Sequence, residues 1–225
     1  MAKRLVDILL AVVGLAVTAP LFAIAGLGVK LSSPGPLLYR ARRVGRGGAC
    51  FTMYKLRTMH LHQAASASRV TGRHDPRVFW WGRVLRRAKI DELPQLWNVL
   101  AGDMSIVGPR PEDPAFVERH YTPLDQETLR LRPGLASPGS LYHYTHGDAV
   151  LAGTDPEAAY VERFMPLKLA LDVVYVRHAS LAQDLRIIGR TIATIAASIG
   201  GRRRFRDPPE AAEARVLMAS NLEQR

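Results

Sequence analysis

The chain has 225 residues, which is enough for one domain with a hydrophobic core and short appendages. Its 31 lysines and arginines outnumber its 20 acidic residues, so the net charge is +11 and indicates an anionic partner such as nucleic acid, anionic lipid or a phosphorylated substrate. The single Cys50 excludes an internal disulfide framework and a four-cysteine metal site, and this composition favours a cytosolic environment.

The N-terminal segment has no charged residue between residues 8 and 29, a length that can cross a bilayer core of about 30 Å. One interpretation is a cleaved signal peptide, because Lys3 and Arg4 precede the apolar run. A second is an ordinary single-pass anchor. The third is a re-entrant helix that Pro20 breaks and that enters and leaves the membrane by the same face. Basic residues flank the segment on both sides, so charge bias does not force a crossing.

Short extended segments follow the apolar run. Turn-forming residues end it at 32–36, and residues 37–40 and 50–54 predict two short strands around a glycine-containing loop at residues 45–48. This loop lacks the spacing of a P-loop, so it is weak evidence for phosphate binding.

Residues 60–74 are rich in histidine, serine, alanine and glycine and predict a mobile surface loop. A zinc site is not expected there, because His60, His62 and His74 show no helical ligand spacing with a nearby acidic partner.

Aromatic and basic residues precede the next feature. Trp80 and Trp81 suit either the headgroup region of a membrane or the protein core. Arg83, Arg86 and Arg87 add positive charge on a predicted basic helix at residues 82–87. Several arginines close in sequence to the acidic residues Asp91 and Glu92 favour phosphate binding over a merely solvated basic face.

Two adjacent carboxylates, Asp91 and Glu92, stand at the start of a predicted helix. Apolar residues at positions 93, 96, 97 and 100 form one helical face, and Pro94 fits a first turn. On the simple interpretation, Asp91 caps this helix and Glu92 favours its positive end. On the functional interpretation, the pair binds a divalent cation beside a phosphate, with Asp91 as nucleophile and Glu92 as its metal-binding neighbour. The residues alone leave open which carboxylate is the nucleophile.

The sequence VGPRP at residues 107–111 supports phosphate chemistry. Two prolines fix the backbone on either side of Arg110 and present its guanidinium from a stiff loop. A planar, permanently charged group of this kind suits a phosphate held by two hydrogen bonds.

Helices dominate the remaining chain. Residues 114–120, 125–132 and 160–181 predict helices, and the helical pattern continues through residues 184–190. The segment at residues 191–199 is an apolar or amphipathic helix that can lie on a membrane. The basic run at residues 200–206 suits anionic lipid headgroups, and the polar tail beyond Pro208 is expected to be mobile.

These motifs resemble the bacterial sugar transferase family, the monotopic phosphoglycosyl transferases that start polysaccharide and glycoconjugate assembly on polyprenol phosphate. The resemblance runs from about residue 3 to about residue 190. The chain differs from the family pattern at Ala19, at Ala41 and over residues 135–146, a segment expected to touch the nucleotide-sugar. The matching motifs are KLRTM at 55–59, DPR at 75–77, GRVLRR at 82–87, DELPQ at 91–95, NVLAGDMS at 98–105 and VGPRP at 107–111.

The resemblance implies a mainly helical α+β fold with three parts. Residues 1–34 are expected to form the re-entrant membrane helix, and residues 35–200 a compact cytosolic phosphoglycosyl transferase domain with interfacial amphipathic helices. Residues 201–225 form the basic junction and the polar tail. The expected location is the inner (cytoplasmic) membrane of a bacterium, with the catalytic domain on the cytoplasmic face.

The resemblance also implies a reaction. Asp91 attacks the sugar-bearing phosphorus of a UDP-sugar, UMP departs, and polyprenol (undecaprenyl) phosphate takes the sugar phosphate from a phosphosugar-aspartyl intermediate. Mg²⁺ is expected at Asp91 and Glu92, and membrane lipids and a possible homodimer are expected as partners, without nucleic acid. The residues expected to bind substrate or phosphate are Lys55, Arg57, Arg86, Arg110, Gln95 and Asp103.

Three alternatives stay open at this point. One is a transferase of the same fold that uses a different nucleotide-sugar. Another is a membrane-tethered basic protein that binds nucleic acid without catalysis, which accounts for the net charge but gives no role to Asp91, Glu92 or the Arg110 loop. The last is a purely structural membrane adaptor, which would keep its function after Asp91→Asn.

Overall fold

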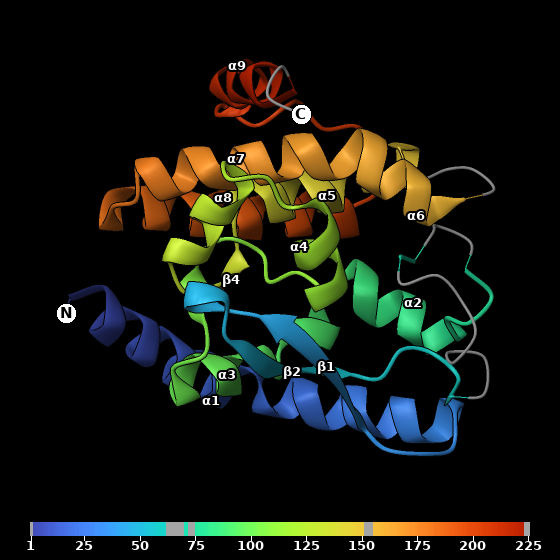
Figure 1. Cartoon of the computed structure of the whole chain (residues 1–225). Helices are drawn as coiled ribbons and strands as arrows, with labels where there is room; N and C mark the ends of the chain where they lie inside the picture. The colour runs from blue at the N-terminus through green and yellow to red at the C-terminus, as the bar shows by residue number, and fades with distance from the viewer. Residues whose placement is uncertain (1, 62–69, 72–74, 151–154, 223–225) are drawn as a thin grey trace.

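A computed structural model describes residues 2–61, 70–71, 75–150 and 155–222 of the chain. In this part the fold is mainly helical with two small two-stranded sheets, as the sequence predicts (Figure 1). The predicted loop at residues 60–74 lies largely outside the described residues, and His62 and His74 lie there too.

Helix α1 (Ala2–Ser32) lies along the rest of the domain (Figure 1). Its first half packs through Ala11 into the cluster that includes α3 (Gln95–Ala101). Its second half packs through Val29 against residues around α2 (Trp80–Arg87). The domain therefore contacts α1 near both of its ends.

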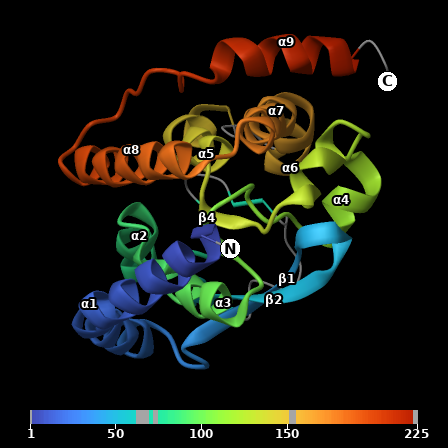
Figure 2. The same cartoon turned by 90° about the vertical axis from the view of Figure 1, so that its left-hand side faces the viewer.

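Pro20 lies inside α1 without ending it. A proline removes one helical hydrogen bond and kinks the helix, and the back-bond from Thr18 Oγ1 to the Gly14 carbonyl oxygen (2.7 Å) lies in the same turns. The axis of α1 changes direction between its halves (Figures 1 and 2). The predicted break at Pro20 is thus a bend in a continuous helix.

Polar contacts fix α1 to the domain at several points. Near its start, Lys3 Nζ donates to Asp184 Oδ2 at 2.6 Å. One turn later, the buried Asp7 carboxylate accepts a hydrogen bond from Ser105 Oγ at 2.9 Å. In the second half, Trp81 Nε1 donates to a backbone carbonyl of α1 at 3.2 Å. Both halves of the helix are therefore held on the same domain.

The opposite face of α1 is apolar and exposed. Among the described helices, α1 alone is long and apolar enough to cross a membrane, by length and composition. Its exposed apolar side chains include Leu5, Leu9, Val12, Val13, Val17, Leu21, Ile24, Leu27 and Leu31.

Strands β1 (Leu38–Val44) and β2 (Cys50–Leu56) form an antiparallel hairpin, which confirms both predicted strands and lengthens them. The intervening 3₁₀ turn, Arg46–Gly48, contains Gly47 at a φ of 67°, a conformation that favours glycine. Lys55 is the last residue but one of β2.

The carboxylate pair lies in the 3₁₀ turn η3 (Ile90–Glu92), between α2 and α3. Helix α3 begins at Gln95 with Pro94 as its N-cap residue, and no side chain caps it. The interpretation of Asp91 as the helix cap is therefore wrong, because the helix begins four residues later in the chain.

For Trp80 and Trp81 the sequence left two settings open, the headgroup region of a membrane or the protein core. Trp80 is 70% exposed, whereas Trp81 is half-buried against α1 in the cluster around Phe79. Only Trp80 is free to meet a headgroup region.

Strands β3 (Ser105–Val107) and β4 (Gly134–Ala136) form a short parallel pair. Gly108, just after β3, and Gly134, the first residue of β4, approach so closely that a Cβ on Gly134 would lie 2.1 Å from the Gly108 nitrogen. No side chain fits at that distance. This contact fixes the start of the loop that carries Arg110.

Helix α4 (Pro114–His120) matches its predicted bounds, and Asp113 caps it by accepting the Ala115 N–H at 3.0 Å. The helix predicted over residues 125–132 is instead the 3₁₀ segment η4 (Asp125–Arg130).

The later helices form a second layer opposite α1, α2, α3 and the hairpin (Figure 2). The helix predicted over residues 160–181 begins with a π-helical turn, and a break at residues 178–180 separates α7 from α8. Helix α5 was not predicted. The elements of this layer are α5 (Pro138–Val150), α6 (Pro156–Ala159), the π-helix η5 (Tyr160–Phe164), α7 (Met165–Arg177) and α8 (Leu181–Ile199).

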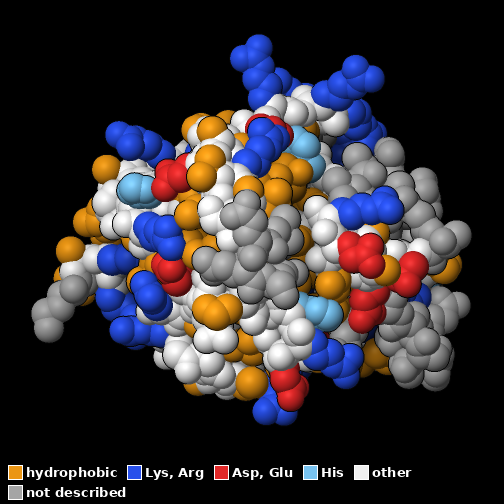
Figure 3. All heavy atoms as spheres, turned by 45° about the horizontal axis from the view of Figure 1, so that its top comes forward, with side chains coloured by type: hydrophobic (Ala, Val, Ile, Leu, Met, Phe, Trp, Pro, Cys, Tyr) orange, Lys and Arg blue, Asp and Glu red, His pale blue; other side chains and the backbone are white. Residues whose placement is uncertain are grey.

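The prediction of a mobile tail is wrong for residues Ala211–Leu222, which form helix α9. Ala211 and Ala214 are buried against α7, in one cluster with Leu171 and Val174. Apolar burial of this kind orders a segment that is polar on average. The face around α9 mixes hydrophobic, basic and acidic side chains (Figure 3).

Candidate active site

Asp91 and Glu92 are both buried, with 7% of each residue exposed. Asp91 Oδ1 is buried and has no hydrogen-bond partner within the described part of the chain. A buried carboxylate oxygen without a partner is costly, since neither water nor protein compensates its lost hydration. Such an atom is a natural point for a ligand or a reacting group to approach.

Three cations surround Glu92. Its Oε1 accepts hydrogen bonds from Arg110 Nη2 at 2.7 Å, from Lys55 Nζ at 3.3 Å and from Lys89 Nζ at 3.4 Å. These donors come from the loop after β3, from β2 and from the turn before η3. Residues distant in sequence thus form one cationic cluster beside the carboxylate pair.

The two carboxylates have opposite electrostatic environments. Burial opposes the ionisation of Glu92, but Arg110 and the lysines outweigh it and hold the pKa of Glu92 well below its usual range. Burial and the neighbouring Glu92 charge raise the pKa of Asp91. The negative charge of Glu92 is therefore balanced by its cations, whereas a charge on Asp91 is disfavoured by its surroundings.

Lys55 is buried beside the same carboxylate pair. Burial lowers the pKa of its amine to about 8, although Glu92 partly opposes this shift. The Glu92 charge raises the pKa of Arg110 despite its burial, so that guanidinium stays charged at any working pH.

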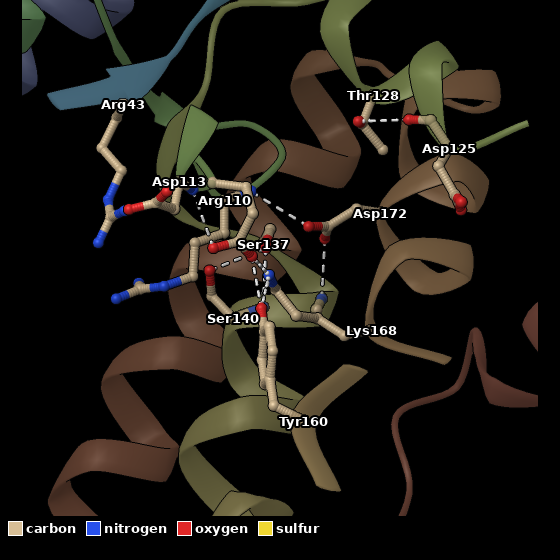
Figure 4. A network of polar contacts seen from close by, with 12 residues as sticks. Arg43, Arg110, Asp113, Asp125, Thr128, Ser137, Ser140, Tyr160, Lys168 and Asp172 are labelled. Atoms are coloured by element: carbon tan, nitrogen blue, oxygen red, sulfur yellow. Dashed lines mark hydrogen bonds and ion pairs between the residues drawn. The ribbon is translucent and has the colours of Figure 1, made fainter. Parts of the chain in front are cut away.

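The Arg110 loop is held from behind by two polar residues of the buried helix α7 (Figure 4). Asp172 Oδ2 accepts the backbone N–H of Arg110 at 3.1 Å, and its Oδ1 accepts that of Gly139 at 2.9 Å. Lys168 Nζ donates to Glu112 Oε2 at 2.5 Å, two residues beyond Arg110. The position of the guanidinium therefore depends on α7 as well as on the flanking prolines.

Glu112 also accepts a hydrogen bond from the Tyr160 hydroxyl, to which Lys168 donates at 2.8 Å. Burial opposes its ionisation, but Lys168 and Tyr160 outweigh this and lower the pKa of Glu112 to about 2. The sequence reasoning missed these three residues and Asp172. The available signal was a lysine and an aspartate four residues apart in an otherwise apolar helical stretch.

Arg86 precedes the carboxylate pair Asp91 and Glu92 in the sequence, and Gln95 follows it. Arg86 Nε donates to Thr58 Oγ1 at 2.8 Å; burial lowers the pKa of Arg86, and the Asp91 charge opposes that shift. Gln95 follows Asp91 by one helical turn and is buried, and its Nε2 has no partner among the described residues. The unpartnered amide suits a hydrogen-bond acceptor supplied by a ligand.

Arg57 and Asp103 are not brought to the pair by the contacts of their side chains. The buried Arg57 guanidinium donates to Ser33 Oγ at 2.7 Å, to the Ser33 carbonyl oxygen at 2.6 Å and to the Pro36 carbonyl oxygen at 2.7 Å. Asp103 accepts from Asn98 Nδ2 at 3.2 Å. Arg57 thus ties the end of α1 to the hairpin.

Arg57→Lys is expected to lower the free energy of unfolding by about 2 kcal/mol, because one ammonium cannot reproduce three charge-assisted hydrogen bonds. The KM for the nucleotide-sugar expected from the sequence should stay within about twofold, since the guanidinium is fully engaged away from the cationic cluster. Denaturant titration and steady-state kinetics measure the two quantities. A KM increase of about tenfold with unchanged stability would instead assign Arg57 to substrate binding.

Residues 135–146 do reach the cationic cluster. Tyr144 donates its hydroxyl hydrogen to the Arg87 carbonyl oxygen at 2.6 Å, and Lys89 Nζ lies 5.1 Å from the centre of its ring. Burial lowers the pKa of His143 well below its usual range, and the charge of Arg110 adds to this shift. The imidazole of His143 is therefore neutral at pH 7. Neither residue was named individually as a site residue, although both belong to the segment that the sequence analysis expects to touch the nucleotide-sugar.

Comparison with known proteins identifies the family of the chain. The family model described as bacterial sugar transferase matches residues 1–198. The chain belongs to the bacterial sugar transferase family.

Curated relatives of this bacterial sugar transferase carry consistent names. The UDP-glucose:undecaprenyl-phosphate glucose-1-phosphate transferase of Caulobacter vibrioides is 41% identical over 195 residues, which cover 86% of this chain and 69% of the relative. A putative undecaprenyl-phosphate N-acetylgalactosaminyl 1-phosphate transferase of Bacillus subtilis is 46% identical over 132 residues, or 59% of this chain and 74% of the relative. The exopolysaccharide production protein ExoY of Rhizobium meliloti is 35% identical and covers 89% of this chain and 88% of its own. The prediction of a transferase of sugar phosphate groups is confirmed.

The carboxylate pair of this sugar transferase fits Mg²⁺ in its chemistry. The described residues contain no group of three or more histidine, cysteine, aspartate or glutamate side chains that could enclose a metal. Mg²⁺ does not need such a cage, because it commonly binds one or two carboxylates, waters and substrate phosphates. Asp91 Oδ1, which has no hydrogen-bond partner among the described residues, is the oxygen of the pair that such an ion fits.

Proposed function

We propose that this bacterial sugar transferase moves a sugar 1-phosphate from a UDP-sugar to undecaprenyl phosphate and releases UMP. The reaction would be the first membrane step of polysaccharide or glycoconjugate synthesis, and exopolysaccharide is the product class that the relatives' names favour. The observation that carries the proposal is the buried, partnerless Asp91 Oδ1 beside a carboxylate held by three cations.

The proposed chemistry has two displacements at one phosphorus. Asp91 Oδ1 attacks the sugar-bearing phosphorus, the bond to the bridging oxygen breaks, and UMP leaves with that electron pair. A phosphate oxygen of undecaprenyl phosphate then attacks the same phosphorus and releases the Asp91 carboxylate. One diphosphate is broken and one is made, so the exchange should be nearly balanced and reversible.

The cationic cluster offsets the charge repulsion between the two anionic reactants. An ionised carboxylate must approach an anionic diphosphate, and fixed positive charges offset that repulsion as charge shifts to the leaving oxygen. Arg110, Lys55 and Lys89 are pre-oriented by Glu92, so they need no reorganisation when the donor binds. Asp91 and Glu92 would hold Mg²⁺, which when bound supplies further positive charge to the phosphoryl oxygens.

The two carboxylates then have separate roles. Glu92 organises the cations, whereas Asp91, whose pKa burial raises, reacts. This assignment supports Asp91 over Glu92 as the nucleophile, the choice that the family resemblance also favours.

We further propose that α1 is re-entrant and that the catalytic domain lies on the cytoplasmic face. Polar contacts near Lys3 and near Trp81 hold the two halves of α1 on one domain, and a straight crossing would carry one end of the helix away from it. The exposed apolar face of the helix supports burial in lipid. Asp91 would then lie at the level of the headgroups, where the phosphate of the lipid substrate also lies.

Cysteine labelling tests this topology. In a Cys50→Ser background, single cysteines replacing Ala2 and Ser32 should both react with a membrane-impermeant maleimide in inside-out vesicles, and neither in intact spheroplasts. Reaction of the two positions from opposite sides would establish a single-pass anchor.

Release of UMP tests the reaction. Detergent-solubilised protein should release UMP from one member of a UDP-sugar panel, and only with Mg²⁺ and undecaprenyl phosphate present. The panel should include UDP-glucose and UDP-N-acetylgalactosamine, because relatives are named for both sugars. No release with any donor, from protein shown to be folded by circular dichroism, would refute the proposed function.

A further inference from the structure

Lys89 has an unusual backbone conformation. Among the described residues it is the one non-glycine residue with a positive φ, 59°, a left-handed conformation that L side chains rarely adopt. It lies directly between α2 and the η3 turn that carries Asp91 and Glu92. This left-handed backbone sets the direction in which the Lys89 side chain leaves the main chain.

Two contacts direct that side chain. Lys89 Nζ donates to Glu92 Oε1 at 3.4 Å and lies 5.1 Å from the centre of the Tyr144 ring. The ammonium is therefore held between a carboxylate and an aromatic face.

Tyr144 is itself fixed at both ends. It belongs to α5, and its hydroxyl donates to the Arg87 carbonyl oxygen at 2.6 Å, at the end of α2. Helix α5 places the ring against the turn that contains Lys89, two residues after Arg87, and the hydroxyl bond adds to this placement. Neither Lys89 nor Tyr144 was named individually as a site residue from the sequence.

We propose that Tyr144 is a positioning residue that holds Lys89 on Glu92 and so completes the cationic cluster that receives the donor diphosphate. The inference rests on the proposed function for its catalytic consequence. The contact itself can be tested without turnover.

The size of the effect follows from the chemistry of the contact. A lysine has a long, flexible stem, and without the ring its ammonium would spread over several rotamers in water. A cation–π contact contributes about 0.5–2 kcal/mol, which corresponds to a loss of roughly 2- to 30-fold when it is removed. Because Tyr144 would act through Lys89, its loss should matter only while Lys89 is present.

A double-mutant cycle tests this dependence. Tyr144→Leu and Lys89→Ala should each lower kcat/KM for UMP release by about tenfold, and the double variant should be no worse than Lys89→Ala alone. Tyr144→Phe keeps the ring and should retain activity within about threefold of the parent. Additive losses, or a phenylalanine variant as impaired as the leucine variant, would overturn the proposal.

Lysine acylation separates this inference from the proposed function. Under limiting reagent, the labelling rate of Lys89 relative to the exposed Lys30 should rise about threefold in Tyr144→Leu and stay unchanged in Tyr144→Phe. An unchanged rate in Tyr144→Leu would refute the contact whether or not the protein turns over a UDP-sugar. If labelling changes as expected but no donor releases UMP, the positioning contact stands and the proposed reaction fails.

Discussion

Replacing Asp91 with asparagine is expected to reduce UMP release by at least about 1,000-fold, because an amide is neither a nucleophile toward phosphorus nor a strong metal ligand. The fold should survive, since the amide has nearly the same shape as the carboxylate and the buried Oδ1 has no partner to lose within the described residues. Stopped-flow or coupled assays of UMP release, with circular dichroism for folding, measure both results.

The same substitution should raise the melting temperature at neutral pH. Burial and Glu92 raise the pKa of Asp91, so the ionised carboxylate destabilises the folded state above that pKa. The penalty disappears as the pH falls below the unfolded pKa of about 3.9. The advantage of Asp91→Asn should therefore be larger at pH 7.5 than at pH 4, and thermal melts at the two pH values compare them.

Glu92→Gln is the matched control. This variant leaves three cations without their shared carboxylate, so it should lower the melting temperature where Asp91→Asn raises it. If Asp91→Asn retained most of its UMP release, or if both variants melted below the parent, the separate roles given to the two carboxylates would be wrong.

Replacing Lys168 with methionine is expected to lower the free energy of unfolding by about 3–5 kcal/mol. Lys168 is 1% exposed and pairs with Glu112, so its removal leaves a buried carboxylate without its cation. Catalysis should fall as well, because Glu112 anchors the loop that presents Arg110. Urea titration and kcat at saturating donor measure the two losses.

The pH dependence gives this prediction a second readout. The folded pKa of Glu112 is about 2 against an ordinary 4.5, so the interaction stabilises the fold above pH 4.5 and is lost as the pH falls towards 2. That difference is worth roughly 3 kcal/mol. In Lys168→Met the acid-induced loss over this range should shrink.

Removing both partners is the control for Lys168→Met. The variant Lys168→Met with Glu112→Leu should be more stable than Lys168→Met alone, since no buried charge is left unpaired. If the double variant were less stable by the sum of the single losses, the pair would not be the origin of the effect.

The sequence predicted the parts of this molecule that depend on local patterning. The hairpin followed from turn residues and short extended runs, and α4 from its Pro-rich start. Asp91, Glu92, Arg110 and Lys55 were chosen as site residues from motif and charge, and the structure brings all four together.

The rest depends on contacts between residues far apart in the chain. Nothing local shows that Arg57 donates to Ser33, or that Lys168 and Asp172 face a loop 56 and 62 residues away. Helix α5 was missed because its sequence begins with proline, glycine and serine and has no clear apolar period. The mobility assigned to the tail was wrong because burial of Ala211 and Ala214 on α7 is a tertiary effect.

The contacts of α1 have a consequence for how the protein is made. Lys3 bonds to Asp184, 181 residues later in the chain. At the ordinary translation rate of about 5–20 residues per second, roughly 10–40 s separate the synthesis of the two residues. During that interval the apolar helix has left the ribosome while Asp184, the partner of Lys3, does not yet exist. On the proposed placement of α1 in lipid, the helix would reach the membrane first, and the rest of the domain would assemble on it afterwards.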